Sequence, residues 1–527
     1  MVTFGHSRPF AIRFLMAFLL LNMLACSFLD DTASEKVETP EMTLEAPEVT
    51  VELHEPSADF FEPTDCSYED LDADVECGYV SVPADYNDPD SDYLQLAVTI
   101  LHAPGGAEYP DPVVYLSGGP GGSATDEVEG WLDQPYLEGR DLILFDQRGT
   151  GASSPSLNCR ELEYEAEESD AELAAACWER LTDAGIEPAL FNSALSAADL
   201  DWLRQVLGYE EWNLLGVSYG TRLALTAMRD HPEGIRSVIL DSVYPPEVNA
   251  YEEEVQNGVR AFDLLFADCA AERDCAAAFP DLEDRFYELL ETLDADPVSF
   301  EVVDPWTEED VAVYLDGKAL VDQIFQSMYD TATIPWIPYA IDQIAQENYE
   351  EAWVLLLGGE SEYQRPRYLV TPQEDDEDLS DSEGVFYSVE CYEEIPFNSW
   401  ETSVALTEAL DSPLTPYLLA DVENQFDVCE VWEVGAAPAM ESRPVSSDIP
   451  TLLLAGQYDP ITPPAWAESA AQHLSRSTLL EFPGVGHSVL DSGECAQSIG
   501  LAFFNHPTDR LNTACLDRLG PPEFYLP

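Results

Sequence analysis

The segment WNLLGVSYGTRLALTAMRDHP (residues 212–232) decides the fold and raises the question of function. Its first residues are mostly apolar and predict a buried strand, and residues 219–230 predict a helix that ends before a proline. Ser218 falls on the turn between them, with Gly216 and Gly220 on either side. These glycines leave room for a sharp turn and for close helix–sheet packing, which pushes the serine hydroxyl out above the sheet. The pattern G-x-S-x-G alone arises by chance in long sequences, so the strand-to-helix context is what predicts a nucleophile.

A serine hydroxyl needs a base, and two residues further along the chain supply an acid and a base in the expected order. Asp459 follows the apolar run TLLLAGQY, and His487 follows LLEFPGVG. Both therefore lie in loops at the ends of predicted strands, as Ser218 does. In such an arrangement His487 accepts the serine proton, and Asp459 fixes the tautomer of the imidazole and stabilises its protonated form. The sequence predicts a catalytic triad of Ser218, Asp459 and His487.

The oxyanion that forms when a serine attacks a carbonyl group requires two backbone N–H donors. The amide of Tyr219, directly after the nucleophile, is predicted to be one of them. The second is predicted in the loop SGGPGGS (residues 117–123), whose glycines let the backbone approach a substrate closely. A phosphate-binding loop is the alternative, but neither G-x-x-x-x-G-K-[ST] nor G-x-G-x-x-G occurs there.

Short apolar runs that end in loops with Gly, Pro or Asp recur through the first half of the chain and again from residue 449. Helical patterns lie between several of them, which predicts an α/β fold with a mostly parallel sheet. Between residues 245 and 442 the pattern is helical instead. We therefore predict a core formed by residues 65–244 and 443–527, with residues 245–442 inserted as a helical cap over the site.

Five motifs together carry a resemblance to a known family: GGPGG (118–122), DQRGTGASS (146–154), GVSYGTRLAL (216–225), GQYDPITPP (456–464) and GVGHS (484–488). On these motifs most of the chain resembles the tripeptidyl aminopeptidase and prolyl iminopeptidase family of α/β hydrolases. It is most similar to the secreted, tripeptidyl-aminopeptidase-like members with a distinct C-terminal segment.

The resemblance implies an α/β-hydrolase fold with an inserted helical cap, a serine peptidase activity without a cofactor, and the triad already named. It assigns the oxyanion amides to Gly119 and Tyr219. It also implies that Asp146 and Arg148 brace a structural loop beside the site. The chain departs from the family pattern at Ser117, where many relatives have histidine, and this departure bears on loop packing rather than on the triad.

Family members that remove residues from peptide N-termini use carboxylates of the cap to hold the substrate's ammonium group, a charge-assisted pair that selects free N-termini. The segment YSVECYEEIPF (387–397) matches such a cap segment. The resemblance therefore makes Glu393 the first candidate for amine binding, followed by Glu394 and Glu390. The alternative is a solvated surface position, because the chain contains 104 Asp and Glu residues.

The function expected from these features is release of residues or short peptides from peptides with a free N-terminus, through an acyl-enzyme. A carboxylesterase with the same triad is the alternative enzyme. A binding lipoprotein that kept the fold and lost activity is the alternative from another class, and the intact triad and oxyanion donors disfavour it.

The charge of the chain excludes one class of partner. Asp and Glu number 104 against 21 Lys and Arg, a formal net charge of -83. Nucleic acids and anionic lipid surfaces would repel such a chain, so no nucleic-acid partner is predicted. Because the acidic excess runs through the whole chain, it indicates adaptation to a saline medium or a generally acidic proteome rather than one binding patch.

Residues 1–25 are typical of a signal peptide. Basic residues precede the apolar run FLMAFLLLNMLA (14–25), which has the length of a signal-peptide core and is too short to span a bilayer comfortably. Cys26 then stands where a bacterial lipoprotein carries its lipid. We expect export with a lipid anchor at Cys26 as the only membrane contact, and simple secretion is the alternative. Residues 26–64 are rich in Glu, Pro and Thr without periodicity and predict a disordered acidic tether.

Eleven cysteines leave ten when Cys26 is set apart, and ten can pair completely in an oxidising compartment. Spacing does not fix connectivity, but pairs close in sequence are the simplest prediction. These pairs are Cys66/Cys77, Cys159/Cys177, Cys269/Cys275, Cys391/Cys429 and Cys495/Cys515. The sequence has no C-x-x-C pair or histidine cluster, so no metal site is predicted.

Overall fold

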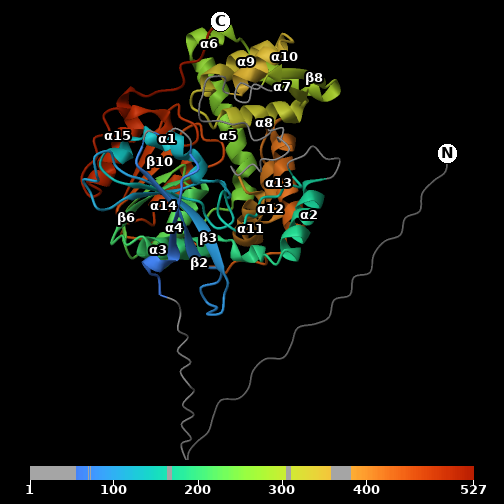
Figure 1. Cartoon of the computed structure of the whole chain (residues 1–527). Helices are drawn as coiled ribbons and strands as arrows, with labels where there is room; N and C mark the ends of the chain where they lie inside the picture. The colour runs from blue at the N-terminus through green and yellow to red at the C-terminus, as the bar shows by residue number, and fades with distance from the viewer. Residues whose placement is uncertain (1–54, 69–70, 72, 163–168, 304–309, 358–380) are drawn as a thin grey trace, which may run out of the picture. The chain divides into compact units, whose positions relative to one another are not determined.

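Nine strands form one sheet in the computed structural model (Figure 1), which describes residues 55–68, 71, 73–162, 169–303, 310–357 and 381–527. The order across the sheet is β1-β2-β3-β5-β4-β6-β7-β10-β11. The strands are β1 (Phe61–Thr64), β2 (Val75–Pro83), β3 (Tyr93–Leu101), β4 (Val113–Leu116), β5 (Leu142–Phe145), β6 (Trp212–Val217), β7 (Ile235–Asp241), β10 (Thr451–Gly456) and β11 (Ser477–Phe482).

The sheet changes character at β5. The pairs β1–β2, β2–β3 and β3–β5 are antiparallel, whereas the strands from β5 through β4, β6, β7 and β10 to β11 run parallel to one another. Every residue of β4, β5 and β10 is buried, as expected for parallel strands that are covered on both faces. The predicted α/β class with a mostly parallel sheet is confirmed.

Helices cover both faces of the sheet, and successive strand residues point to opposite faces. In β6, Leu214 packs in a cluster with residues of α3 and α4, while Leu215 packs in a second cluster with residues of α15. The core helices are α1 (Val128–Leu132), α2 (Asp170–Asp183), α3 (Ser193–Val206), α4 (Tyr219–Asp230), α14 (Pro464–Ala471) and α15 (Glu494–Asn505).

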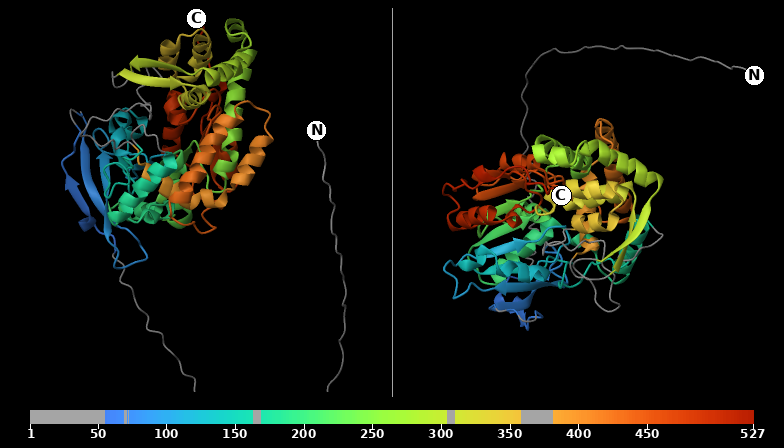
Figure 2. Two further views of the ribbon diagram at one scale, coloured as in Figure 1. Left: turned by 90° about the vertical axis from the view of Figure 1, so that its right-hand side faces the viewer. Right: turned by 90° about the horizontal axis from the view of Figure 1, so that it is seen from above.

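The inserted region is mostly helical, as predicted, but it also contains a two-stranded hairpin of β8 (Val298–Val303) and β9 (Asp310–Leu315). Figure 2 shows this hairpin beside the helices that form the outer part of the cap. The helices are α5 (Ala250–Ala271), α6 (Arg273–Ala278), α7 (Leu282–Ala295), α8 (Gly317–Ser327), α9 (Ile337–Ala345), α10 (Tyr349–Leu356), α11 (Glu383–Glu393), α12 (Trp400–Glu408) and α13 (Thr415–Val431).

The structure corrects the predicted cap boundary. The outer part, around α5 and α7–α10, has its own apolar core, in which Phe262, Phe266 and Phe286 contact one another. By contrast, α11 and the end of α13 pack into the same apolar cluster as α3 and α4. Helix α2, which was predicted in the core, packs against α13, and Trp178 meets Trp432 edge to face at 5.2 Å. Packing therefore joins α11 and the end of α13, here called the inner cap, to the sheet domain.

The structure also corrects the predicted tether. Strand β1 lies within the residues predicted to be disordered, and it pairs antiparallel with β2 from Phe61 to Thr64. Its burial is slight and its sequence contains a proline, which is why an edge strand was not recognised. The predicted signal peptide and Cys26 lie outside the described residues.

All five predicted disulfides are present. Disulfides persist in oxidising compartments, so their number favours a protein that works outside the cytosol. Cys391–Cys429 joins α11 to α13 and so ties together the two inner helices of the cap. Within the described residues, no helix has the length and apolar character needed to cross a membrane.

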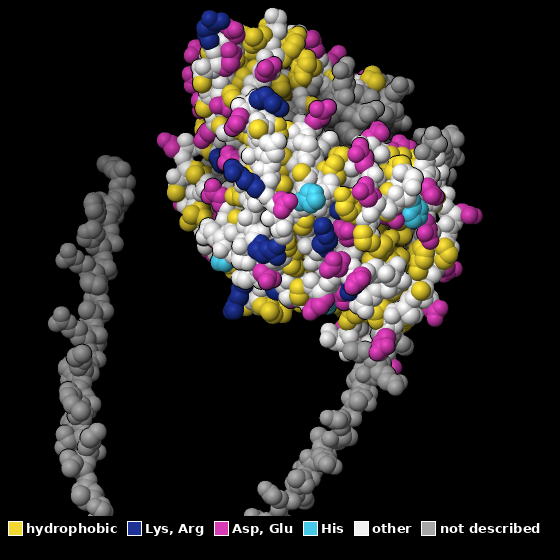
Figure 3. Space-filling model, turned by 90° about the vertical axis from the view of Figure 1, so that its left-hand side faces the viewer, with side chains coloured by type: hydrophobic (Ala, Val, Ile, Leu, Met, Phe, Trp, Pro, Cys, Tyr) yellow, Lys and Arg dark blue, Asp and Glu magenta, His cyan; other side chains and the backbone are white. Residues whose placement is uncertain are grey.

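The acidic surface predicts that salt stabilises the fold. Figure 3 shows Asp and Glu side chains scattered over one face rather than gathered in a patch. With a net charge of -83, mutual repulsion destabilises the compact state, and screening shortens its range from roughly 30 Å at 0.01 M salt to roughly 3 Å at 1 M. We expect the thermal unfolding midpoint to rise steadily with NaCl. Scanning calorimetry measures it, and a midpoint that stays constant or falls would contradict the interpretation.

Candidate active site

Ser218 occupies a strained turn between β6 and α4. Its backbone has φ 55° and ψ -125°, a conformation that L-residues seldom adopt and that is found at functional sites. A side chain on Gly216 would overlap the backbone of Gly220, and a side chain on Gly220 would overlap the carbonyl group of Leu116 in β4. Both glycines are therefore required for the helix to pack this closely, as the sequence predicted.

The candidate acid and base form a close pair, in which the acid is buried and the base is partly buried. Asp459 follows β10, His487 follows β11, and the Asp459 carboxylate lies 2.9 Å from Nδ1 of His487. Asp459 has no exposed surface, and the Thr462 hydroxyl and backbone amide donate hydrogen bonds of 2.7 and 2.8 Å to its two oxygens. Since β6, β7, β10 and β11 are neighbours and parallel, Ser218, Asp459 and His487 all lie at the carboxyl edge of one sheet.

The electrostatics suit an acid–base pair. Burial alone would raise the pKa of Asp459, but its interaction with His487 and its hydrogen bonds lower that pKa below the usual value. Burial alone would lower the pKa of His487, but the charge of Asp459 and the hydrogen bond to it outweigh burial and raise that pKa. The arrangement therefore stabilises an imidazolium next to an ionised carboxylate, which is what proton transfer from a serine produces.

Two backbone amides close to the candidate nucleophile have no acceptor among the described residues. The glycine-rich loop lies against Ser218, because a Cβ atom on Gly118 would lie 3.0 Å from the Ser218 Cβ. Within the described part of the chain, the N–H groups of Gly119 and Tyr219 donate to no protein atom. Gly119 has φ 105°, which favours glycine at this point of the loop. These are the amides predicted for the oxyanion.

Asp146 fixes the end of the glycine-rich loop through hydrogen bonds. Its carboxylate accepts hydrogen bonds from the backbone amides of Ala124, Thr125 and Ala152 at 2.8 to 2.9 Å. Arg148 forms a fully buried ion pair with Asp199 of α3, at 2.7 Å. The bracing role predicted for Asp146 and Arg148 is confirmed.

The cap contributes contacts to the candidate acid that sequence reasoning missed. Arg260 in α5 donates one hydrogen bond of 2.7 Å to the carbonyl of Gln457 and another to the carbonyl of Asp459. Arg260 is also electrostatically attracted to Asp459. An arginine on a cap helix carries no sequence signal for this role, because the contact exists only after the cap docks on the sheet domain.

A second cap segment, at the end of α8, holds the loop of the candidate base. The carbonyl of Tyr329 accepts a 2.9 Å hydrogen bond from the amide of His487, and the two rings lie 4.9 Å apart. The Thr331 hydroxyl accepts a 3.1 Å hydrogen bond from the amide of Gly486. The cap therefore contacts both loops that carry the acid and the base.

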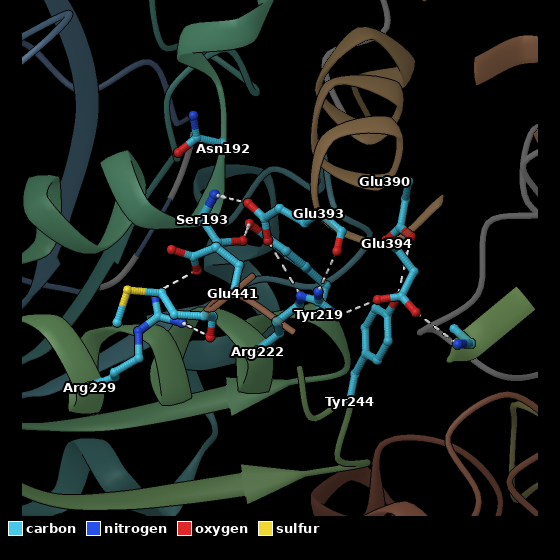
Figure 4. A network of polar contacts seen from close by, with 12 residues as sticks. Asn192, Ser193, Tyr219, Arg222, Arg229, Tyr244, Glu390, Glu393, Glu394 and Glu441 are labelled. Carbon is cyan, nitrogen blue, oxygen red and sulfur yellow. Dashed lines mark hydrogen bonds and ion pairs between the residues drawn. The ribbon is translucent and has the colours of Figure 1, made fainter. Parts of the chain in front are cut away.

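The three glutamates predicted for amine binding are buried at the inner end of the cap (Figure 4), so none is a solvated surface group. Glu393 and Glu394 form ion pairs with Arg222, which lies one helical turn after Ser218, at 3.4 and 2.8 Å. Glu393 also accepts a 2.6 Å hydrogen bond from the amide of Ser193. These two carboxylates therefore already have a cation and join α11 to α4.

Glu390 differs from its neighbours. It accepts a hydrogen bond of 3.2 Å from the Tyr244 hydroxyl, and no described Lys or Arg forms an ion pair with it. Burial first, and then the proximity of Glu394, raise the pKa of Glu390 to about 8. It is the one of the three carboxylates whose charge is left without a close cation.

One group of described residues has the spacing of metal ligands: Cys159, Cys177 and Glu161. The two cysteines are joined as a disulfide, and their sulfur atoms are therefore not thiolate ligands. Glu161 instead pairs with Arg180 at 2.6 Å.

Removal of the Arg260 guanidinium tests the contact between cap and acid loop. We expect Arg260→Met to lower kcat about 10- to 100-fold with a smaller change in KM, because the loop carrying Asp459 loses two hydrogen bonds and moves away from its aligned position. The Arg285→Met variant is the matched control, since Arg285 pairs with Asp342 in the outer cap. Steady-state hydrolysis and thermal unfolding of both variants separate the effects, and equal kcat values in the two would contradict the assignment.

Comparison with known proteins agrees with this geometry. A family model described as alpha/beta hydrolase fold matches residues 111–494. The chain is 24% identical to the serine protease Hip1 of Mycobacterium tuberculosis over 79% of this chain and 82% of that one. It is 30% identical to the tripeptidyl aminopeptidase of Streptomyces lividans over 50% of this chain and 52% of that one. It is 26% identical to the carboxylesterase B of Mycobacterium tuberculosis, over 81% and 84%.

The family match covers the parallel strands of the sheet and the inserted helices, and the relatives include enzymes named as peptidases and as an esterase. The chain therefore belongs to the α/β hydrolase fold family and is a hydrolase of the kind to which the tripeptidyl aminopeptidases belong.

Proposed function

We propose that the protein is an exported serine aminopeptidase that releases residues or short peptides from the N-termini of short peptides. The observation that carries the proposal is the hydrogen-bonded Asp459–His487 pair at the same sheet edge as the strained Ser218, next to an inner cap that buries three glutamates. Relatives named as a tripeptidyl aminopeptidase and a serine protease support the peptide substrate.

The proposed mechanism uses the chain's own groups. The Ser218 hydroxyl attacks the scissile carbonyl carbon while His487 accepts its proton, and Asp459 stabilises the imidazolium. The amides of Gly119 and Tyr219 donate to the oxyanion of the tetrahedral intermediate. His487 then donates the proton to the leaving amine, which leaves an acyl-enzyme on Ser218. Water, activated by His487, hydrolyses the acyl-enzyme and releases the N-terminal fragment.

Glu390 is the carboxylate best suited to hold the substrate's ammonium group. Glu393 and Glu394 share ion pairs with Arg222, whereas Glu390 forms no ion pair with a described Lys or Arg and accepts hydrogen bonds from the hydroxyls of Tyr244 and Tyr251. A buried carboxylate without a cation gains most from an ammonium ligand, because the pair removes the cost of its ionisation. The geometry thus favours Glu390 over the order expected from the sequence.

The proposal includes export. Five disulfides support an oxidising compartment. The apolar run before Cys26 supports a signal peptide, with lipidation of Cys26 as the membrane anchor and secretion as the alternative. The net charge of -83 disfavours nucleic-acid partners.

A carboxylesterase is the second candidate function, because the relative named carboxylesterase B matches over most of both chains. The same triad and oxyanion amides serve ester cleavage. What separates the two functions is recognition of a free amine, and that depends on the cap rather than on the triad. An inert binding lipoprotein is the third candidate, and it predicts no turnover at all.

A substrate panel tests the function directly. We expect the protein to cleave free-amine mono- and tripeptide chromogenic amides, to cleave their N-acetylated forms at least about 100-fold more slowly, and to lose this activity in the Ser218→Ala variant. The panel includes a short acyl ester and measures kcat/KM for each substrate.

The outcomes separate the three candidates. Equal cleavage of free and acetylated amides would contradict amine recognition. Ser218-dependent cleavage of the ester alone would establish the carboxylesterase. Absence of Ser218-dependent turnover on every substrate would favour the binding protein.

The pH dependence of KM tests Glu390. Its pKa of about 8 means that it is protonated below that pH, so KM for free-amine peptides should fall as pH rises toward 8, where the carboxylate ionises. KM should rise again above about pH 8, where the substrate's α-amine loses its proton. The Glu390→Gln variant should lose the limb below pH 8, and its kcat/KM for free-amine peptides should fall about 10- to 100-fold.

The N-acetylated peptides provide the control for this variant, because they have no ammonium group to bind. If Glu390→Gln slows free-amine and acetylated substrates equally, Glu390 acts on the structure of the cap rather than on the amine.

A further inference from the structure

Asp241 is the last residue of β7, the strand that lies between β6, which leads to Ser218, and β10, which leads to Asp459. It has no exposed surface. Neither the proposed triad nor the oxyanion amides include it, and no motif in the sequence singles it out. A buried carboxylate requires hydrogen-bond partners, and the identity of those partners shows what Asp241 does.

The contacts of Asp241 join two parts of the site. Its backbone carbonyl accepts a 3.0 Å hydrogen bond from the amide of Ser218. One carboxylate oxygen accepts a 2.8 Å hydrogen bond from the amide of Val489, and the other accepts one of 2.8 Å from the amide of Leu490. Val489 and Leu490 directly follow the loop of His487. One residue therefore holds the turn of the nucleophile and the segment after the base.

The next residue extends the same connection. The Ser242 hydroxyl accepts a 2.9 Å hydrogen bond from the amide of Ser488, and the Ser242 amide donates a 3.0 Å hydrogen bond to the carbonyl of Leu454 in β10. Ser242 has φ 56°, so it too occupies a sparsely populated backbone conformation that its contacts must maintain. Three consecutive amides, from Ser488 to Leu490, are thus fixed by Asp241 and Ser242.

We propose that Asp241 is a positioning residue of the reaction: its carbonyl fixes the turn of Ser218, its carboxylate fixes the segment after His487, and its charge stabilises the imidazolium. The groups that interact with it electrostatically are His487, Asp491 in the segment after the base, and Tyr136, which packs in the same apolar cluster as Val489 and Leu490. Of these, only His487 carries a positive charge.

The titration of these groups agrees with this role. Burial raises the pKa of Asp241, the amides of Leu490 and Val489 and the charge of His487 oppose the rise, Asp491 adds to it, and the resulting pKa is about 7. Reciprocally, Asp241 and Asp491 add to the effect of Asp459 in raising the pKa of His487. Loss of the Asp241 charge should therefore lower the pKa of His487.

A probe that reacts with the serine of any such hydrolase makes the test independent of the proposed function. A fluorophosphonate forms a bond between Ser218 Oγ and phosphorus as the phosphorus–fluorine bond breaks, fluoride leaves, and His487 takes the serine proton. Its rate against pH in the full-length protein reports the titration of His487, whether the substrate is a peptide or an ester.

We expect Asp241→Asn to slow phosphonylation about 10- to 100-fold at neutral pH and to move the acid limb of the rate profile to lower pH. The rate falls because an amide group accepts only one of the two backbone hydrogen bonds. The limb moves because the imidazolium loses a neighbouring negative charge. Asp241→Glu keeps the charge and should restore the position of the limb.

Asp146→Asn is the matched control, since Asp146 is an equally buried carboxylate that holds backbone amides on the oxyanion side of the site. It should slow the reaction without moving the limb. An unchanged rate in Asp241→Asn would overturn the proposal, and so would a slower rate with an unmoved limb, which would indicate a structural role alone.

Ser242→Ala keeps the proposal testable if Asp241→Asn does not fold. It removes the acceptor of the Ser488 amide and changes no charge, so it should slow phosphonylation several-fold and leave the acid limb in place. A wild-type rate in this variant would overturn the positioning role of this connection. Failure of the peptide panel, by contrast, would leave the phosphonylation results unaffected and would concern only the proposed substrate.

Discussion

Buried carboxylates at the carboxyl edge of the sheet are the constraint on which the site depends. A buried charge must be matched by hydrogen bonds or by a cation, and at this edge the matching groups are mostly backbone amides of the loops. Asp146 holds the glycine-rich loop, Asp241 holds the segment after His487, and Asp459 holds its own loop and the imidazole. Each carboxylate lies at or just after the end of a different strand, so the spacing of the strands sets the spacing of the loops.

The cap completes this arrangement rather than lying over it as a separate body. Arg260 binds the loop of Asp459, and the backbone of Tyr329 binds His487. The ion pairs of Arg222 with Glu393 and Glu394 join the inner cap to α4, the helix that follows Ser218. The disulfide Cys391–Cys429 joins its two helices, α11 and α13, to each other. Geometry at the proposed triad and the proposed recognition in the cap are therefore parts of one structure.

The same reasoning distinguishes the three glutamates of the inner cap. All are buried, so burial alone does not separate them. Arg222 forms ion pairs with Glu393 and Glu394, whereas Glu390 forms none with a described Lys or Arg and has its pKa raised to about 8. The proposed recognition of a substrate's ammonium group therefore depends on Glu390 rather than on its two neighbours.

The sequence by itself determined the α/β class, the order of Ser218, Asp459 and His487, the glycine-rich loop and the disulfide pairs. It did so because these features are local: apolar runs, glycines beside one turn, and cysteines that are neighbours in the chain. The edge strand β1 and the hairpin of β8 and β9 were missed, since short or half-exposed strands leave a weak pattern. Only the tertiary structure decided that Arg260 and Tyr329 contact the triad loops, that Asp241 joins two of them, and that Glu390 lacks a cation. Those facts depend on contacts between residues far apart in the chain, and no local pattern encodes which carboxylate a distant arginine will reach.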